Sequence, residues 1–225
     1  MSTTWSTIRG RIRSKLDQAA SGGVFADADL LIYFNDAQRL AWPLLPDRIF
    51  NSNSRGVTTH TVKSPVANDK VQALSRDATC MRTLSMSNTT AATSTTKNGP
   101  VIWLSSRDEI YDKMVDATNW SAGVSDCYAA PENDQIYVGP VYAGDVFMER
   151  FVKFPTAQTA TTSTCDLPDD YIHILETETV ARALDQVGSP IAAKWHADAE
   201  KYILAIYARF GQNPPPMLIP TPKKV

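Results

Sequence analysis

The chain has 225 residues, with 43% hydrophobic and 20% charged residues and a formal net charge of -2. This length permits a substantial core, whereas the slight acidity argues against a strongly basic, general nucleic-acid binder. No apolar run approaches the roughly 20 residues that span a bilayer, so we expect no membrane partner. Residues 18–22, Gln-Ala-Ala-Ser-Gly, follow the N-terminal basic residues in place of an apolar core, so we expect no secretory signal. The three cysteines form no CxxC pair and are predicted to be free thiols in a reducing cytoplasm.

The first predicted element is an amphipathic helix near the N-terminus. Its apolar residues recur at steps of three and four: Trp5, Ile8, Ile12 and Leu16. Residues 21–23, Ser-Gly-Gly, are expected to end this helix. A second helix is predicted to begin with Asp27 as its N-cap and to end before Pro43. Because the connection is short, the two helices should form a hairpin.

From residue 57 to residue 154 the composition favours strands, since threonine, valine and aromatic residues dominate between turn residues. The clearest pattern covers residues 127–155, where two alternating segments flank a turn at Gly144. These segments predict an antiparallel meander. Between the strands, Ser105 and Ser106 are placed to cap a short helix.

Two further helices are predicted after a threonine-rich linker. Pro168 suits the first turn of the first of them, and Ser189-Pro190 is expected to begin the second, which ends at Gly211. The first of these helices has two adjacent apolar faces, one formed by Ile174, Ala181 and Leu184 and the other by Ile172, Leu175 and Thr179.

The order of these elements predicts an α+β fold. Each helix pair leaves an apolar face bare, so the two pairs should pack into one helical bundle with the antiparallel β module inserted between them. The expected parts are residues 1–50 for the N-terminal helix pair, 51–160 for the β module, 161–211 for the C-terminal helix pair and 212–225 for an extended C-terminal arm.

The arm begins with three consecutive prolines, residues 214–216, which stiffen the chain into an extended form. Three apolar residues follow, Met217, Leu218 and Ile219, on a segment too short to bury them itself. We interpret the arm as a segment that docks into a neighbouring protein, with a frayed terminus as the alternative.

The sequence offers little for catalysis. It contains no nucleophile-elbow, phosphate-binding-loop or zinc-protease motif. His173 and Glu176 lie three residues apart on one helix, a spacing more typical of a surface pair than of a metal site. The paired carboxylates Asp108-Glu109 and Asp169-Asp170 lie at predicted helix starts, where their negative charges interact favourably with the positive end of the helix dipole. We therefore expect no enzyme activity, no cofactor and no metal.

The basic residues of the first helix leave two interpretations open. Arg9, Arg11 and Arg13 form either a solvated face beside the apolar stripe or an electrostatic contact with DNA phosphates or an acidic partner.

Three stretches together resemble the head-to-tail connector proteins of tailed bacteriophages, also called adaptor or tail accessory proteins. The first follows a glycine turn, the second has a strand–proline–strand character, and the third opens the C-terminal helices. They comprise residues 25–38 (Phe-Ala-Asp-Ala-Asp-Leu-Leu-Ile-Tyr-Phe-Asn-Asp-Ala-Gln), residues 135–140 through 149–151, and residues 167–171 followed by residues 181–184, residues 188–190 and Trp195.

This resemblance implies a structural virion protein. Its subunits would form a ring, commonly a dodecamer, between the portal protein and a tail or nozzle protein, with viral DNA passing through the lumen. It also implies a virion-neck location, assembly in the bacterial host cytoplasm and an arm that binds the portal. By position, that role falls on Met217, Leu218, Ile219, Pro220, Lys223 and Lys224.

Two other functions remain as alternatives. One is a DNA-binding packaging or accessory module centred on the arginines of the first helix. The other is a virion-associated cell-wall hydrolase that uses acidic residues such as Asp169 or Glu176.

Overall fold

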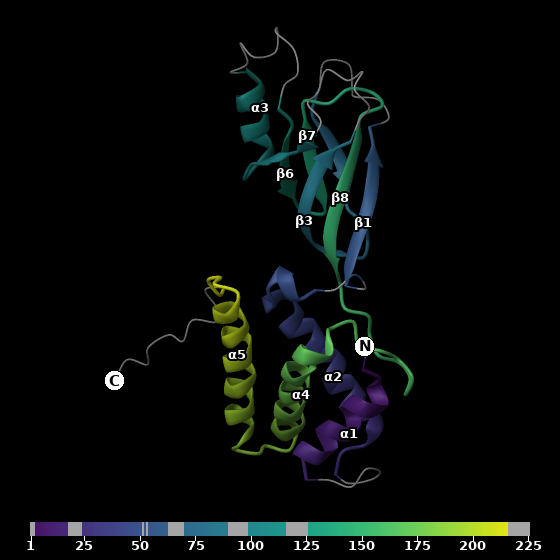
Figure 1. Cartoon of the computed structure of the whole chain (residues 1–225), viewed down its shortest axis with the longest axis vertical. Coiled ribbons are helices and arrows are strands. Elements are labelled where there is room, and N and C mark those ends of the chain that lie inside the picture. The colour runs from purple at the N-terminus through teal and green to yellow at the C-terminus, as the bar shows by residue number, and fades with distance from the viewer. Residues whose placement is uncertain are drawn as a thin grey trace, which may run out of the picture. The chain divides into compact units, whose positions relative to one another are not determined.

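The computed structural model describes residues 3–17, 24–50, 52, 54–62, 70–89, 99–115 and 126–215 (Figure 1). The chain divides into two compact units. One, here called the helical unit, comprises Met1–Ser54 and Phe154–Val225, and the other, here called the β unit, comprises Arg55–Lys153. Helices stand at both ends of the chain and strands in its middle, so the predicted α+β class is confirmed.

Four α-helices of the described residues build the helical unit: α1 (Trp5–Lys15), α2 (Asp27–Ala41), α4 (Ile172–Gln186) and α5 (Ala192–Arg209). Short 3-10 helices, Trp42–Leu44, Asp47–Ile49 and Asp169–Tyr171, flank α2 and α4. Helix α4 packs against all three others, with α5 on one side and the α1–α2 pair on another (Figure 1). The two predicted apolar faces of α4 explain this central position, because all of their residues except Leu184, which is half-buried, are buried.

The predicted stripe of α1 is confirmed at Trp5, Ile8 and Ile12, which are buried. The ring of Trp5 packs on Phe34 of α2, with ring centroids 5.2 Å apart. The N-terminus is also tied to the threonine-rich linker, since the backbone N–H of Trp5 donates to the carbonyl of Ser163 at 2.8 Å.

Two predicted helix starts were wrong in detail. Ala26, and not Asp27, occupies the N-cap position of α2, and no side chain caps that helix. The carboxylate of Asp27 instead binds Arg9 and Arg13, whose charged donors compete better for it than a backbone N–H does. Likewise, α5 begins at Ala192, after a turn in which the Ala192 N–H donates to the Ser189 carbonyl.

The β unit contains two four-stranded sheets among the described residues. The first has the order β1-β8-β3-β4 and the second the order β2-β7-β6-β5. All neighbours are antiparallel except β5 and β6. The strands are β1 (Arg55–Thr61), β2 (Gln72–Ser75), β3 (Cys80–Asn88), β4 (Gly99–Pro100), β5 (Ile102–Trp103), β6 (Tyr128–Glu132), β7 (Gln135–Gly139) and β8 (Val146–Lys153).

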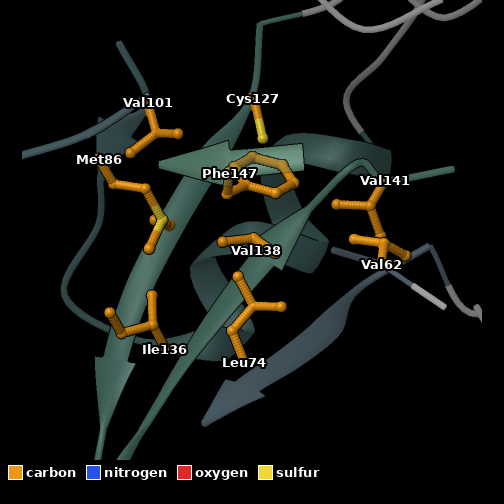
Figure 2. Packing of buried hydrophobic residues seen from close by; sticks show 10 residues of the cluster. Val62, Leu74, Met86, Val101, Cys127, Ile136, Val138, Val141 and Phe147 are labelled. Atoms are coloured by element: carbon orange, nitrogen blue, oxygen red, sulfur yellow. The ribbon is translucent and has the colours of Figure 1, made fainter. Parts of the chain in front are cut away.

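The predicted meander was only partly right. Strands β6 and β7 form an antiparallel hairpin within this region, but β8, which follows the Gly144 turn, does not pair with β7 and instead pairs with β1 and β3 in the other sheet. Its side chains show why, because Phe147 of β8 faces Val138 of β7 across the core (Figure 2). The two apolar faces are buried more completely by packing face to face than by pairing edge to edge.

The core of the β unit lies between these sheets. It consists of Val62, Leu74, Met86, Val101, Cys127, Ala129, Ile136, Val138, Val141 and Phe147. Helix α3 (Arg107–Val115) packs Ile110 against Val71 and Ala130, which are outside this cluster. The predicted serine cap of α3 is confirmed, since Ser106 Oγ accepts a hydrogen bond from the Glu109 N–H and the Glu109 carboxylate accepts one from the Ser105 N–H.

Candidate functional site

The basic residues of α1 are held in ion pairs within the helical unit. Arg9 and Arg13 both bind Asp27, at 2.5 Å for Arg13 Nη2, and Arg13 Nη2 also donates to the Phe25 carbonyl at 3.0 Å. The side chain of Arg13 is only 1% exposed, so its charge depends on Asp27 for compensation. Arg11 remains 49% exposed. Of the three arginines predicted to contact DNA or an acidic partner, Arg11 therefore retains the most accessible charge.

Glu176 joins α1 to α4 through a buried carboxylate. Its Oε1 accepts a hydrogen bond from Arg11 at 3.3 Å, and its Oε2 accepts one from Lys15 Nζ at 2.8 Å. Asp169, the other acid considered for hydrolysis, accepts a hydrogen bond from the Thr3 hydroxyl at 2.5 Å. Each of these carboxylates thus fixes the N-terminal segment onto the C-terminal helices, which is a structural role.

Two histidines lie on the C-terminal helices, but the structure gives them different surroundings. His173 packs edge-on against Tyr202, with ring centroids 4.7 Å apart, and burial lowers its pKa. His196 of α5 bridges two carboxylates of α4, with Nδ1 2.8 Å from Glu178 and Nε2 2.7 Å from Asp185. Burial alone would lower the pKa of His196, but the hydrogen bonds to Asp185 and Glu178 outweigh it and raise that pKa.

A groove of about 420 Å³ lies where α2, α4 and α5 meet. We call it the α2–α4–α5 groove. Apolar side chains predominate in its lining, with charged groups and His196 among them. The lining consists of Leu40, Ala41, Leu44, Ile174, Glu178, Arg182, His196, Ala199, Glu200 and Ile203. The sequence did not predict this groove, because the α2 side of its lining is more than a hundred positions away from the α4 and α5 sides.

The β unit holds a second buried acid that the sequence did not reveal. Glu149 of β8 is fully buried and accepts hydrogen bonds from Thr83 Oγ1, at 2.5 Å, and from His60 Nε2, at 2.9 Å. Burial by itself raises the pKa of Glu149, but these hydrogen bonds outweigh it and hold that pKa below its ordinary value. Burial raises the pKa of the neighbouring Cys80 thiol to about 11, so this thiol stays protonated near neutral pH.

The six residues predicted to bind a portal, Met217 to Pro220 and Lys223-Lys224, lie outside the described residues. Within the described part of the chain, no cluster of three or more His, Cys, Asp or Glu side chains is arranged to hold a metal ion. None of the helices in that part has the length and apolar character required to cross a membrane.

Comparison with known proteins gives one match that covers nearly all of the chain. A search of curated proteins found none that matches. A family model described as SU10 adaptor protein matches residues 3–216, which include both helix pairs and the whole β unit. A match of this extent agrees with the connector resemblance. The chain belongs to the SU10 adaptor protein family.

Proposed function

We propose that the chain is the subunit of a closed ring, dodecameric as the connector resemblance implies, which joins a phage portal to the tail or nozzle below. The family match over residues 3–216 carries this proposal. The family establishes the coarser role, that of a structural adaptor and not of an enzyme class. The ring, its lumen and its partners are the parts that we propose.

The surface of the helical unit supports assembly with copies of itself. Subunits of a ring contact their neighbours through two different surfaces, so each subunit needs apolar area on two sides. Ile32 of α2 is 56% exposed and Tyr202 of α5 is 42% exposed, and these helices pack on different sides of α4 (Figure 1). A permanent interface of this kind usually buries more than about 2,000 Å².

The charge distribution supports a lumen that lets DNA slide. Tight binding to DNA needs many uncompensated cations, because each phosphate contact adds to affinity. The chain carries a net charge of -2, and the arginines of α1 are paired with Asp27 and Glu176. For Arg11 we therefore propose a transient contact with DNA or an acidic partner. Arg9 and Arg13 are less exposed than Arg11, and both bind Asp27 within the helical unit.

The arm supplies the proposed portal contact. Deleting residues 217–225 should leave a folded chain that binds portal rings at least tenfold more weakly, because the apolar residues Met217 to Ile219 and two lysines are lost. Co-sedimentation with purified portal measures this, and thermal unfolding checks the fold. A full-length variant with Lys223→Glu and Lys224→Glu separates the charge from the apolar contribution. Undiminished binding of the deletion variant would refute the role of the arm.

A further inference from the structure

The α2–α4–α5 groove offers an apolar site that the helices themselves leave open. Ile174, Ala199 and Ile203 are buried side chains that line it. Leu40 also lines it and remains 56% exposed. A volume of about 420 Å³ falls in the range that holds a small ligand or a few side chains, roughly 300–1,000 Å³. The groove is therefore suited to a short apolar segment.

The end of α5 turns the chain out of the helix. Gly211 has a φ of +62°, the left-handed conformation that a glycine adopts without strain at a helix end. The Gln212 N–H donates to the Tyr207 carbonyl at 3.0 Å, which completes a Schellman-type turn. Pro214 and Pro215, the last described residues, are half-buried.

The segment that follows has the length needed to reach the groove. Ile203 lies about 12 Å before Gly211 along the axis of α5, and His196 about 22 Å before it, at 1.5 Å per residue. An extended, proline-rich chain covers about 3.1 Å per residue, so Met217 lies within roughly 19 Å of Gly211. Met217, Leu218 and Ile219 can therefore lie alongside the part of α5 that lines the groove.

Carboxylates in and beside the groove are opposite in charge to the lysines of the C-terminal segment. Glu200 lines the groove, is exposed and has no ion-pair partner among the described residues. Asp185, which binds His196, is 57% exposed. The segment carries Lys223 and Lys224 shortly after its apolar residues. Lysines that follow an apolar anchor would thus meet carboxylates beside an apolar groove.

We propose that the α2–α4–α5 groove binds Met217, Leu218 and Ile219 of the same chain. This site would cover the apolar part of the arm in the free subunit and release it when the arm engages another protein. The binding itself needs no second protein, so its test is independent of the proposed portal contact.

Cysteine cross-linking in the full chain tests the proposal. Thr221→Cys places a thiol just after the apolar residues and leaves them intact, and Leu40→Cys places its partner on the groove. Arg39→Cys with Thr221→Cys is the matched control, because Arg39 is also exposed but does not line the groove. The native thiols should not interfere at pH 8, since burial raises the pKa of Cys80 to about 11 and those of Cys127 and Cys165 to about 12.

We expect the Leu40→Cys pair to form an intramolecular disulfide at least tenfold faster than the Arg39→Cys pair. Adding Met217→Ser, Leu218→Ser and Ile219→Ser to the Leu40→Cys pair should reduce the rate of disulfide formation to that of the control, and thermal unfolding checks that this variant is folded. Equal rates for the two pairs would overturn the proposal. A covalent dimer in place of the intramolecular product would assign the groove to the arm of a neighbouring copy and would overturn it as well.

Discussion

Replacing Glu149 with alanine is expected to lower the free energy of unfolding of the β unit by about 3–5 kcal/mol. The carboxylate is 0% exposed and accepts the hydrogen bonds of His60 and Thr83, which would lose their acceptor within the fold. Urea denaturation measures the loss, and hydrogen exchange at β1 and β8 assigns it to this unit. Glu132, an exposed residue of β6, provides the control, since Glu132→Ala should cost less than about 0.5 kcal/mol.

The ionisation of Glu149 adds a pH dependence to this prediction. Because its pKa is lower in the folded chain than in the unfolded chain, the charged form stabilises the fold above the unfolded value, near pH 4.3. That contribution is lost as the pH falls through the folded pKa. Glu149→Gln keeps the shape and should reduce this acid sensitivity. A Glu149→Ala variant as stable as Glu132→Ala, with an unchanged pH profile, would contradict the structural role of Glu149.

Replacing Arg13 with alanine is expected to destabilise the helical unit by about 3–5 kcal/mol. The change removes a buried side chain, both of its hydrogen bonds to Asp27 and its hydrogen bond to the Phe25 carbonyl. Arg11→Ala is the matched control from the same helix. Arg11 is half-exposed and Glu176 keeps Lys15 as a partner, so this change should cost at most about 1 kcal/mol.

Denaturant unfolding followed by hydrogen exchange at α1 and α2 separates these two arginines. Arg13→Lys should lose less stability than Arg13→Ala but should not match the native chain, because an ammonium group cannot reproduce the forked geometry of a guanidinium. Equal, small effects of Arg13→Ala and Arg11→Ala would show that the buried ion pairs of α1 do not hold the helical unit together.

The helices could be predicted from the sequence because their signals are local. The stripe through Trp5, Ile8 and Ile12 repeats within a few turns, and the two adjacent apolar faces of α4 repeat at helical spacing as well. The placement of β8 could not be predicted in this way. An alternating strand shows which residues face the core, but not which of two sheets it joins.

The ion pairs and the groove could not be predicted from the sequence either, because their residues lie far apart along the chain. Arg11 and Glu176 are 165 positions apart, and His60 and Glu149 are 89 apart, so no local pattern connects them. Asp27 shows the same effect at shorter range, since its position favoured a cap while two arginines of α1 offered stronger donors. The groove depends on three helices that only the fold brings together.

Electron microscopy of the full chain mixed with the portal protein of its phage tests the central claim most directly. We expect a closed ring of copies seated on one end of the portal, with an open channel that continues the portal axis. Isolated subunits scattered on the portal surface, or portal rings that stay bare at saturating concentrations of the chain, would contradict the ring-forming adaptor proposed here.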